Sequence, residues 1–246
     1  MLRIVTHNAY WFQGAPSLWG AEAQHMHPRA YAALIALYRR QSPDVLCLQE
    51  VPGFQLYSQL CSDLQMTGHY TPGGIFAAYG GVVLIRGLSA DFRDCSRDSV
   101  VPGRVFERSN QRVRFDADGR ELWLVNAHLQ SRRYAPNRNA TPLQLQEVSR
   151  VMAYEPRPDI LLGDLNFRRG TEVYEHVEQL GYVDTAACAG CDDLEERSVD
   201  HIFVSLDLAP HVKENYRITG PEFEVEVDGN THRLSDHDPV VAELEL

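Results

Sequence analysis

The sequence Ser235-Asp236-His237-Asp238-Pro239 places a histidine between two carboxylates, immediately before the final apolar run of the chain. A histidine flanked in this way can be held in one orientation and kept basic. A group that removes a proton from water needs both properties. His237 is therefore the first candidate for a catalytic base, and Asp236 lies beside it in the chain.

Further polar side chains lie at or just beyond the ends of other apolar runs. If those runs are neighbouring strands, the side chains meet at one edge of a sheet, where α/β proteins place their sites. The set offers acidic oxygens for a hard divalent ion, amides that orient an oxygen, and histidines for proton transfer or phosphate contact. It predicts a Mg²⁺ site, with Mn²⁺ as a substitute. The seven members are Asn8, Glu50, His128, Asp164, Asn166, Asp200 and His237, and Gln49 is a further polar residue at the strand end that carries Glu50.

The elements that position these residues can be read from the hydrophobic pattern. We expect strands over 2–8, 45–50, 81–85, 105–115, 121–129, 159–163, 199–204 and 240–246, with a peripheral strand over 223–227. We expect helices over 28–40, 54–64, 141–154 and 171–180, and a hairpin turn at 116–119. Strands and helices alternate without a linker or an internal repeat, so the expected architecture is one α/β domain spanning residues 1–246.

Charge is distributed unevenly along the chain. The formal net charge is −11, and residues 184–246 hold 16 acidic and 4 basic residues. Eight arginines lie between Arg104 and Arg138, and a phosphate-binding face and an ordinary solvated face explain them equally well. The overall acidity argues against tight non-specific binding to DNA, although a local basic strip could still act.

Nothing in the sequence indicates a membrane span or export. The first residues read as a strand rather than a leader, and no apolar run reaches the ~20 residues of a membrane helix. The five cysteines have no disulfide spacing, which fits a reducing compartment. Cys188 and Cys191 are expected to be two loop thiols rather than a metal or redox pair. We expect a soluble cytoplasmic monomer without integral membrane association.

Six short motifs, in their order along the chain, resemble those of the endonuclease/exonuclease/phosphatase superfamily, which shares the deoxyribonuclease I-like fold. They span residues 6–239, nearly the whole sequence. They are Thr6-His7-Asn8, Leu48-Gln49-Glu50-Val51, Asn126-Ala127-His128-Leu129, Gly163-Asp164-Leu165-Asn166, Val199-Asp200-His201-Ile202 and Ser235-Asp236-His237-Asp238-Pro239.

The resemblance implies an α/β (α+β) fold: a four-layered α/β/β/α sandwich of two mixed sheets with outer helices and the site at one end. It also implies roles. Glu50 would be the principal Mg²⁺ ligand, with Asn8 and Asp236 assisting. His237, paired with Asp200, would be the general base.

In the same resemblance, Asp164 would position or deprotonate the water, and Asn166 would hold a phosphate oxygen. His128 would contact the phosphoryl group. The reaction would be in-line displacement at phosphorus by an activated water. Which of Asp164 and His237 takes the proton stays open.

The substrate is less constrained than the reaction, since members of this superfamily cut DNA, RNA, phospholipids and small phosphate esters. The segment from Asp164 to Arg168, with an arginine two residues beyond Asn166, resembles the 5′-tyrosyl-DNA phosphodiesterase branch of the superfamily. Arg168 could bind a phosphate, or it could be an exposed loop arginine. A phosphodiester with a nucleic-acid strand or end is the favoured substrate. A sphingomyelinase-like or inositol-phosphate hydrolase is the alternative, and a non-catalytic phosphate-binding module is a remote one.

Other residues of these types carry simpler expectations. The aromatics at 10–12, with Trp19, could stack bases or enter a lipid interface, but packing over helix 28–40 is the preferred interpretation. His7 is expected to pack, and Asp238 to lead into the last strand. Structural or surface roles are expected for His25, His27, His69, His176, His201, His211 and His232.

Overall fold

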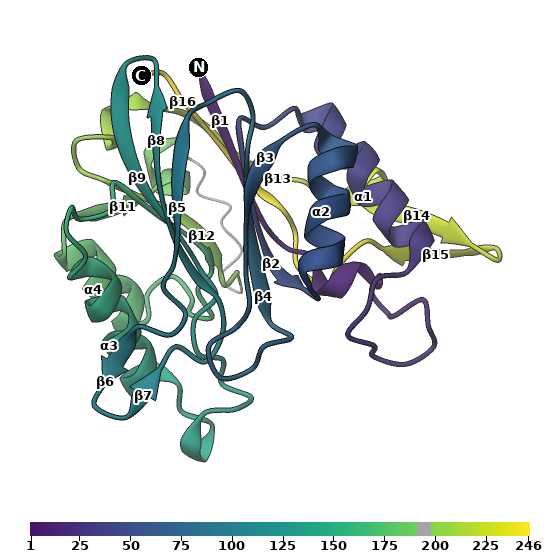
Figure 1. The fold of residues 1–246 in the computed structure, drawn as a ribbon, viewed down its shortest axis with the longest axis horizontal. Helices are drawn as coiled ribbons and strands as arrows, with labels where there is room; N and C mark the ends of the chain where they lie inside the picture. The colour runs from purple at the N-terminus through teal and green to yellow at the C-terminus, as the bar shows by residue number, and fades with distance from the viewer. Residues whose placement is uncertain (191–197) are drawn as a thin grey trace.

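The computed structural model describes residues 1–190 and 198–246, and two six-stranded sheets dominate it (Figure 1). The first sheet has the order β13-β16-β1-β2-β4-β3. Its central strands β1 and β2 run parallel, and the other pairs are antiparallel. The strands are β1 (Leu2–Asn8), β2 (Val45–Val51), β3 (Thr67–Thr71), β4 (Gly80–Ile85), β13 (Val212–Arg217) and β16 (Val240–Leu244).

The second sheet has the order β11-β12-β10-β9-β8-β5. It is also mixed, because β10 and β9 are parallel while the neighbouring pairs are antiparallel. The strands are β5 (Ala90–Asp94), β8 (Asn110–Ala117), β9 (Arg120–Ala127), β10 (Ile160–Asp164), β11 (Tyr182–Asp184) and β12 (Asp200–Ser205).

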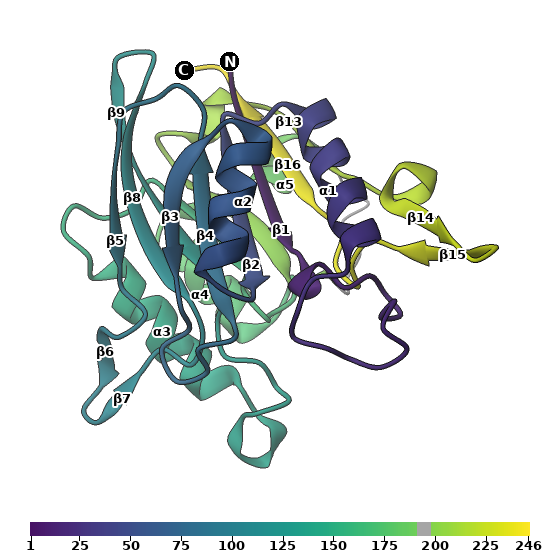
Figure 2. The ribbon, with the colours of Figure 1, turned by 45° about the vertical axis from the view of Figure 1, so that its right-hand side comes forward.

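The two sheets pack face to face and each carries helices on its outer side. Ile4 and Val83 of the first sheet meet Leu124 and Leu162 of the second in one buried cluster. Helices α1 (Pro28–Gln41) and α2 (Phe54–Leu64) cover the first sheet, and α3 (Thr141–Met152) and α4 (Glu172–Gln179) cover the second (Figures 1 and 2). The result is the predicted four-layered α/β/β/α sandwich.

The helices follow from an apolar stripe at helical spacing. In α1, Leu34 and Tyr38 are four residues apart and fully buried against the first sheet. Burial of a leucine side chain is worth about 2 kcal/mol, so this stripe fixes the helix to the sheet. Pro28 occupies the first turn, where its missing N–H costs nothing, and Ser42 closes the helix in the left-handed conformation.

Smaller elements decorate the sandwich. Two hairpins stand outside the main sheets, and the expected peripheral strand at 223–227 is the first strand of one of them. These elements are β6 (Ser99–Val101) with β7 (Arg104–Val105), β14 (Glu224–Val227) with β15 (Asn230–Arg233), the short helix α5 (Thr185–Cys188), and the 3₁₀ turns η1 (Tyr10–Phe12), η2 (Pro136–Arg138), η3 (Ala209–His211) and η4 (Gly220–Phe223).

Two kinds of difference separate these elements from the expected ones. The strand expected over 105–115 begins only at Asn110, because the carbonyls of Glu107 and Arg108 accept from the backbone of residues 74–76 instead of a sheet neighbour. The strands β3, β5 and β13 were not expected. They lie at or next to the sheet edges with mostly polar, partly exposed residues, so they lack the apolar run that marks a central strand.

The structure bears on the expectations for membrane spans and for the cysteines. Among the described residues, no helix is both long and apolar enough to cross a bilayer. Cys188 is a half-buried free thiol, but it ends helix α5 rather than lying in a loop, so the loop prediction for it is wrong. Cys191 lies outside the described residues.

Candidate active site

The ends of four central strands bring the predicted residues together at one end of the sandwich. In the parallel pair, Asn8 of β1 is in register with Gln49 of β2, which places Glu50 next to it. In the second sheet, Asp164 at the end of β10 is in register with Asp200 at the start of β12. A hydrogen bond from Asn8 to Asp164 then joins the two sheets at this point.

Asp164 is the hub of the cluster. Its Oδ2 accepts from Asn8 Nδ2 at 2.9 Å and lies 3.1 Å from His128 Nε2, while Oδ1 accepts from the backbone N–H of Asn166 at 3.1 Å. Burial favours the protonated form, but the contacts from His128 and His237 outweigh it and hold the pKa of Asp164 below its usual value. Asp164 is therefore a buried carboxylate with fixed oxygens.

A glycine makes this position of Asp164 possible. Gly163 has φ of 130°, and a side-chain carbon there would collide with the backbone carbonyl oxygen of Ala127 on the neighbouring strand. Only glycine fits such a close approach between β10 and β9. Asn166, which follows, is left-handed with φ of 55°, a conformation that asparagine tolerates better than most residues.

His237 is oriented by Asp200. Its Nδ1 lies 2.8 Å from Asp200 Oδ2, which fixes the proton on Nδ1, and its Nε2 lies 3.9 Å from Asp164 Oδ2. Burial opposes the charged ring, yet Asp200 and Asp164 outweigh it and hold the pKa of His237 well above its usual range. A distance of 3.9 Å is too long for a hydrogen bond, but one water molecule could bridge both atoms.

Glu50 lies at a β-bulge, where β2 shifts register between Gln49 and Val51, and it is left-handed with φ of 54°. Backbone strain of this kind concentrates at functional sites. The side chain is only 7% exposed, and Oε2 has no hydrogen-bond partner among the residues that the structure describes. Burial raises the pKa of Glu50 to about 8, with the carboxylates of Asp164 and Asp236 adding to the effect.

This donor set fits a hard divalent cation. A buried carboxylate oxygen without a partner, as on Glu50, is costly unless a cation or a proton satisfies it. Asp164, Asp200 and His237 also place three ligand-type atoms within 4.8 Å of one another. Their hydrogen-bonded His–Asp arrangement suits proton transfer better than ligation of a hard ion, which prefers oxygen. The side of the cluster at Glu50 is the better place for the metal.

The remaining predicted residues occupy varied positions. Asn8 Oδ1 accepts from the backbone of Tyr10 at 3.0 Å, which leaves one lone pair for an ion. His128 is buried, and burial together with the charge of Arg108 lowers its pKa to about 4, so its ring is neutral. Asp236 and Arg168 are exposed at the rim of the site. Asn166 donates from Nδ2 to the carbonyl of Leu129 at 3.1 Å.

Gln49, the neighbour of Glu50 at the end of β2, joins a buried network of polar side chains between the sheets. Its amide donates to Asn126 Oδ1 at 2.7 Å and to Thr6 Oγ1 at 3.1 Å, and Asn126 in turn donates to Gln111 Oε1 at 2.9 Å. All four side chains are buried between the two sheets. This amide network ties the sheets together below the site, which is the physical reason for a glutamine there.

His7 does more than pack. Its Nε2 lies 3.1 Å from the backbone carbonyl oxygen of His237 and its Nδ1 lies 2.6 Å from the hydroxyl of Tyr38. Burial lowers the pKa of His7 to about 3, so the ring is neutral, donating from Nε2 and accepting at Nδ1. Ser235 Oγ donates to the Asn8 carbonyl at 2.7 Å and accepts from the His237 N–H at 3.2 Å, so two contacts fix the position of His237.

One charged residue near the site, Arg108, was not among the predicted site residues. Arg108 is 3% exposed, donates to the Leu129 carbonyl and to Ser131 Oγ, and lies over the ring of Tyr79 at 4.6 Å. Its charge lowers the pKa of Glu50 and of His128. Only its membership of the arginine-rich segment hinted at it, and that segment does not form one face. In the same segment, Arg114 is paired with acidic groups at the surface.

The aromatic residues after Asn8 pack only in part as expected, since Trp11 and Phe12 are buried whereas Trp19 is 45% exposed. The ring of Phe12 lies tilted against that of Tyr31 on α1, with 5.7 Å between the ring centroids, and Trp11 donates from its indole N–H to the carbonyl of Ala78. His201 is a structural histidine, because it is buried between Asp184 at 2.8 Å and the carbonyl of Phe167 at 3.0 Å. These interactions support the loop that carries Asn166.

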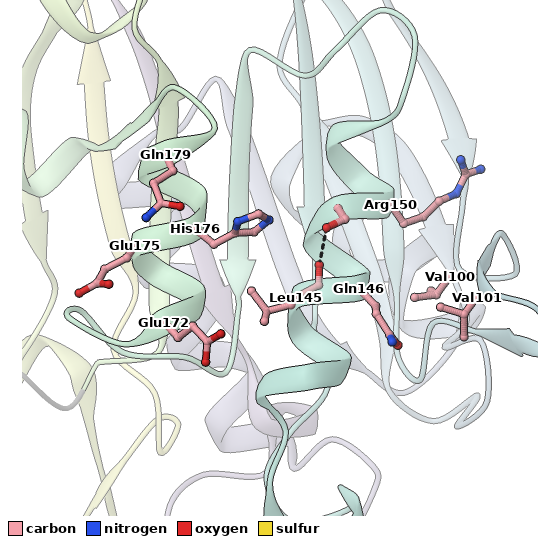
Figure 3. A pocket seen from close by; sticks show the side chains of 10 residues that line it. Val100, Val101, Leu145, Gln146, Arg150, Glu172, Glu175, His176 and Gln179 are labelled. Atoms are coloured by element: carbon pink, nitrogen blue, oxygen red, sulfur yellow. Dashed lines mark hydrogen bonds between the residues drawn. The ribbon is translucent and has the colours of Figure 1, made fainter.

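Two large cavities lie in the second half of the sandwich. One, of about 750 Å³, lies on the outer surface between α3, α4 and the β6–β7 hairpin, and Figure 3 shows Glu172 and His176 of α4 facing Leu145 of α3 across it. It contains none of the residues of the cluster. The other, of about 630 Å³, includes both Asn166 and Arg168 and therefore adjoins the reaction centre.

Comparison with known proteins agrees with this geometry. The protein-family model described as the endonuclease/exonuclease/phosphatase family matches residues 5–237. No curated protein sequence matches significantly. Solved structures with the same fold include a mannosyl-6-phosphatase of Bacteroides thetaiotaomicron, with 17% identity, 100% of both chains covered and a TM-score of 0.72.

Two further structures are similar over nearly their whole length. A humanized D. rerio TDP2 has 20% identity, with 98% of this chain and 97% of that chain covered and a TM-score of 0.68. The human nocturnin catalytic domain has 18% identity, with 98% and 92% covered and a TM-score of 0.71. With the family model matching from β1 to His237, the chain belongs to the endonuclease/exonuclease/phosphatase family.

Proposed function

We propose that this protein is a divalent-metal-dependent phosphodiesterase that hydrolyses its substrate with an activated water. The observation that carries the proposal is the gap between His237 Nε2 and Asp164 Oδ2. At 3.9 Å, the two atoms are too far apart for a direct hydrogen bond and close enough for a single water to contact both. Asp200, 2.8 Å from Nδ1, keeps the Nδ1 proton in place, so Nε2 is the atom that accepts a proton in the neutral ring. The acidic neighbours raise the pKa of His237 and favour the charged ring, and a divalent ion bound beside the cluster would lower that pKa and make the neutral form available.

His237 is the better candidate for the base. Asp164 Oδ2 already receives contacts from Asn8 and His128, whereas His237 Nε2 has no donor within hydrogen-bond distance among the described residues. Asp164 then acts as the acceptor that orients the water, and its own partners hold it in place. In this arrangement the proton moves from the water to His237 Nε2, and Asp200 stabilises the resulting imidazolium.

Glu50, assisted by Asn8 and Asp236, would hold the ion, with Mg²⁺ as the natural choice and Mn²⁺ as its substitute. A bound divalent ion would neutralise charge on the phosphoryl oxygens. Asn166 and Arg168 at the rim would orient the phosphate. The predicted contact of His128 with the phosphoryl group stays a prediction, since its Nε2 is engaged with Asp164 in this structure.

A polynucleotide is the favoured substrate, because the exposed Arg168 lies beside the reaction centre, where a phosphate chain would pass. The alternatives are a phospholipid and a small phosphate ester. The structural similarity to a mannosyl-6-phosphatase supports the small phosphate ester as an alternative. A panel with Mg²⁺ separates them: single- and double-stranded DNA, a 5′-tyrosyl oligonucleotide, RNA, sphingomyelin and inositol phosphates.

The reaction class is tested with bis-p-nitrophenyl phosphate. The purified protein should turn it over with Mg²⁺ or Mn²⁺, lose activity in EDTA and regain it when metal is returned. Glu50→Ala, Asp164→Ala and His237→Ala should each lower kcat by about 10² or more while the circular dichroism spectrum is kept. Glu175→Ala on α4, away from the cluster, is the matched control.

If neither metal supports turnover between pH 6 and 9, the phosphodiesterase proposal is refuted and a non-catalytic phosphate-binding module remains. Near-wild-type rates in any of the three variants would show that the role assignment is wrong.

A further inference from the structure

The cavity of about 630 Å³ beside the reaction centre has an unusual lining. Three arginines face it, and the described lining residues include no acidic side chain. By contrast, the larger cavity on the outer surface combines Arg150 and His176 with Glu172 and Glu175. The lining residues are Arg132, Asn137, Arg138, Asn139, Ala140, Thr141, Gln144, Asn166, Phe167, Arg168, Thr171, Val173 and Val199.

None of the carboxylates that the structure describes neutralises the arginines in this cavity. Within the described ranges, no carboxylate lies within ion-pair distance of Arg132, Arg138 or Arg168, although the protein as a whole has a net charge of −11. Toward the described residues, Arg132 donates from Nε to the backbone carbonyl of Arg138 at 3.0 Å. Three like charges repel one another across a cavity, and a bound anion would turn that repulsion into attraction.

The loop that carries two of these arginines has a strained backbone. Asn137 and Arg138 are both left-handed, with φ of 52° and 54°. Asparagine accepts this conformation easily, but arginine does so at a cost. Arg138 lines the cavity together with Arg168, which lies on the segment that follows β10.

The cavity is fixed to the reaction centre through Asn166. The N–H of Asn166 donates to Asp164 at 3.1 Å, and its carbonyl accepts from Gln144 at 2.8 Å. Gln144 is buried and also donates to the carbonyl of Gln130 at 2.8 Å, so α3 holds this wall in place. Asn166 lies two residues beyond Asp164, and two residues of extended chain span at most about 7 Å. An anion in the cavity would therefore lie close to a phosphate that is hydrolysed beside Asp164.

We infer that this cavity, here named the arginine pocket (Arg132, Arg138 and Arg168), binds a second phosphate of the substrate, next to the one that is hydrolysed. The inference rests on the proposed function and narrows it. The enzyme selects substrates that carry adjacent phosphates, as an oligonucleotide does, over those with one phosphodiester, such as sphingomyelin. The guanidinium groups of the three arginines would provide this selectivity, because each can donate two parallel hydrogen bonds to a pair of phosphate oxygens.

Chromogenic substrates that differ by one phosphate test the inference. Thymidine 5′-(p-nitrophenyl phosphate) is compared with the same compound carrying a 3′-phosphate, and thymidine 3′-(p-nitrophenyl phosphate) with its 5′-phosphorylated form. In at least one pair the second phosphate should raise kcat/KM about tenfold or more, mostly through KM, and the gain should shrink as salt rises. Equal kcat/KM values within both pairs would overturn the inference.

Variants assign the gain to the pocket. In the Arg132→Gln/Arg138→Gln/Arg168→Gln protein, the ratio of kcat/KM between the two members of a pair should fall to about one. The matched control, Arg29→Gln/Arg40→Gln/Arg93→Gln, removes the same charge from exposed positions on α1 and β5 and should keep the wild-type ratio. A control that loses the ratio equally would show that net charge, not the pocket, makes the selection.

Binding measurements separate failure of the inference from failure of the proposed function. Calorimetry with Mg²⁺ compares thymidine 3′,5′-bisphosphate with each thymidine monophosphate, and the bisphosphate should bind about tenfold more tightly or better in the wild type only. Tight bisphosphate binding without turnover of any substrate would refute the phosphodiesterase and keep the pocket. Turnover with equal binding of all three nucleotides would refute the pocket and keep the phosphodiesterase.

Discussion

Glu147 of α3, which lies behind the site, offers a test of whether burial keeps a carboxyl group protonated in the folded protein. This side chain of α3 is 1% exposed and accepts from the backbone N–H of Gln130 at 2.8 Å. Burial raises the pKa of Glu147 from 4.5 to about 7; the Glu107 carboxylate adds to the effect and Arg104 opposes it. Folding therefore favours the protonated carboxyl group.

The sign and size of the effect on stability follow from linkage. Between pH 4.5 and 7 the unfolded chain binds fewer protons at this position than the folded protein, so the free energy of unfolding falls as pH rises. With these two pKa values, the loss attributable to Glu147 between pH 5 and 8.5 is about 2 to 3 kcal/mol. Glu147→Gln, which is neutral at every pH, should remove this loss.

Urea unfolding at half-unit pH intervals measures the difference in unfolding free energy between Glu147→Gln and the wild type. That difference should move in favour of the variant by about 2 to 3 kcal/mol between pH 5 and 8.5, while all other titrating groups cancel. The exposed Glu175→Gln on α4 serves as the control for removing one charge, and its difference should stay nearly flat. Parallel stability curves for Glu147→Gln and the wild type would refute the reasoning that burial holds this carboxyl group protonated.

Three further perturbations address the site and the interface between the sheets. Gln49→Leu leaves the buried Oδ1 of Asn126 without its donor and should lower the unfolding free energy by about 2 to 3 kcal/mol; an equal loss in Gln146→Leu, on the exposed side of α3, would contradict this. Tyr38→Phe leaves His7 Nδ1 unpaired and should cost about 1 kcal/mol of stability and lower kcat severalfold at nearly constant KM; a change in KM alone would argue against a role in positioning His237. Arg168→Ala should raise KM for oligonucleotides more than for bis-p-nitrophenyl phosphate, and equal effects on both would speak against a polynucleotide contact.

The sequence alone was sufficient to predict site residues where the chemistry requires a particular residue type at the end of a strand. The motifs around Asp164 and His237 predicted both the sandwich and the residues that the structure gathers, because central strands have long apolar runs and the site chemistry needs carboxylates and imidazole at their ends. The helices α1 and α2 were equally predictable, since an apolar stripe such as Leu34 and Tyr38 is a local signal.

Only the tertiary structure decided the direction and partners of the polar side chains. Gln49 and Glu50 are neighbours in the chain, yet a bulge turns Glu50 toward the site while Gln49 joins the network between the sheets. The assembly of Arg132, Arg138 and Arg168 around one cavity also depends on two loops more than 25 residues apart in the chain. Sequence patterns record which residues are polar or apolar at each step, but contacts between distant segments are set by how the two sheets pack.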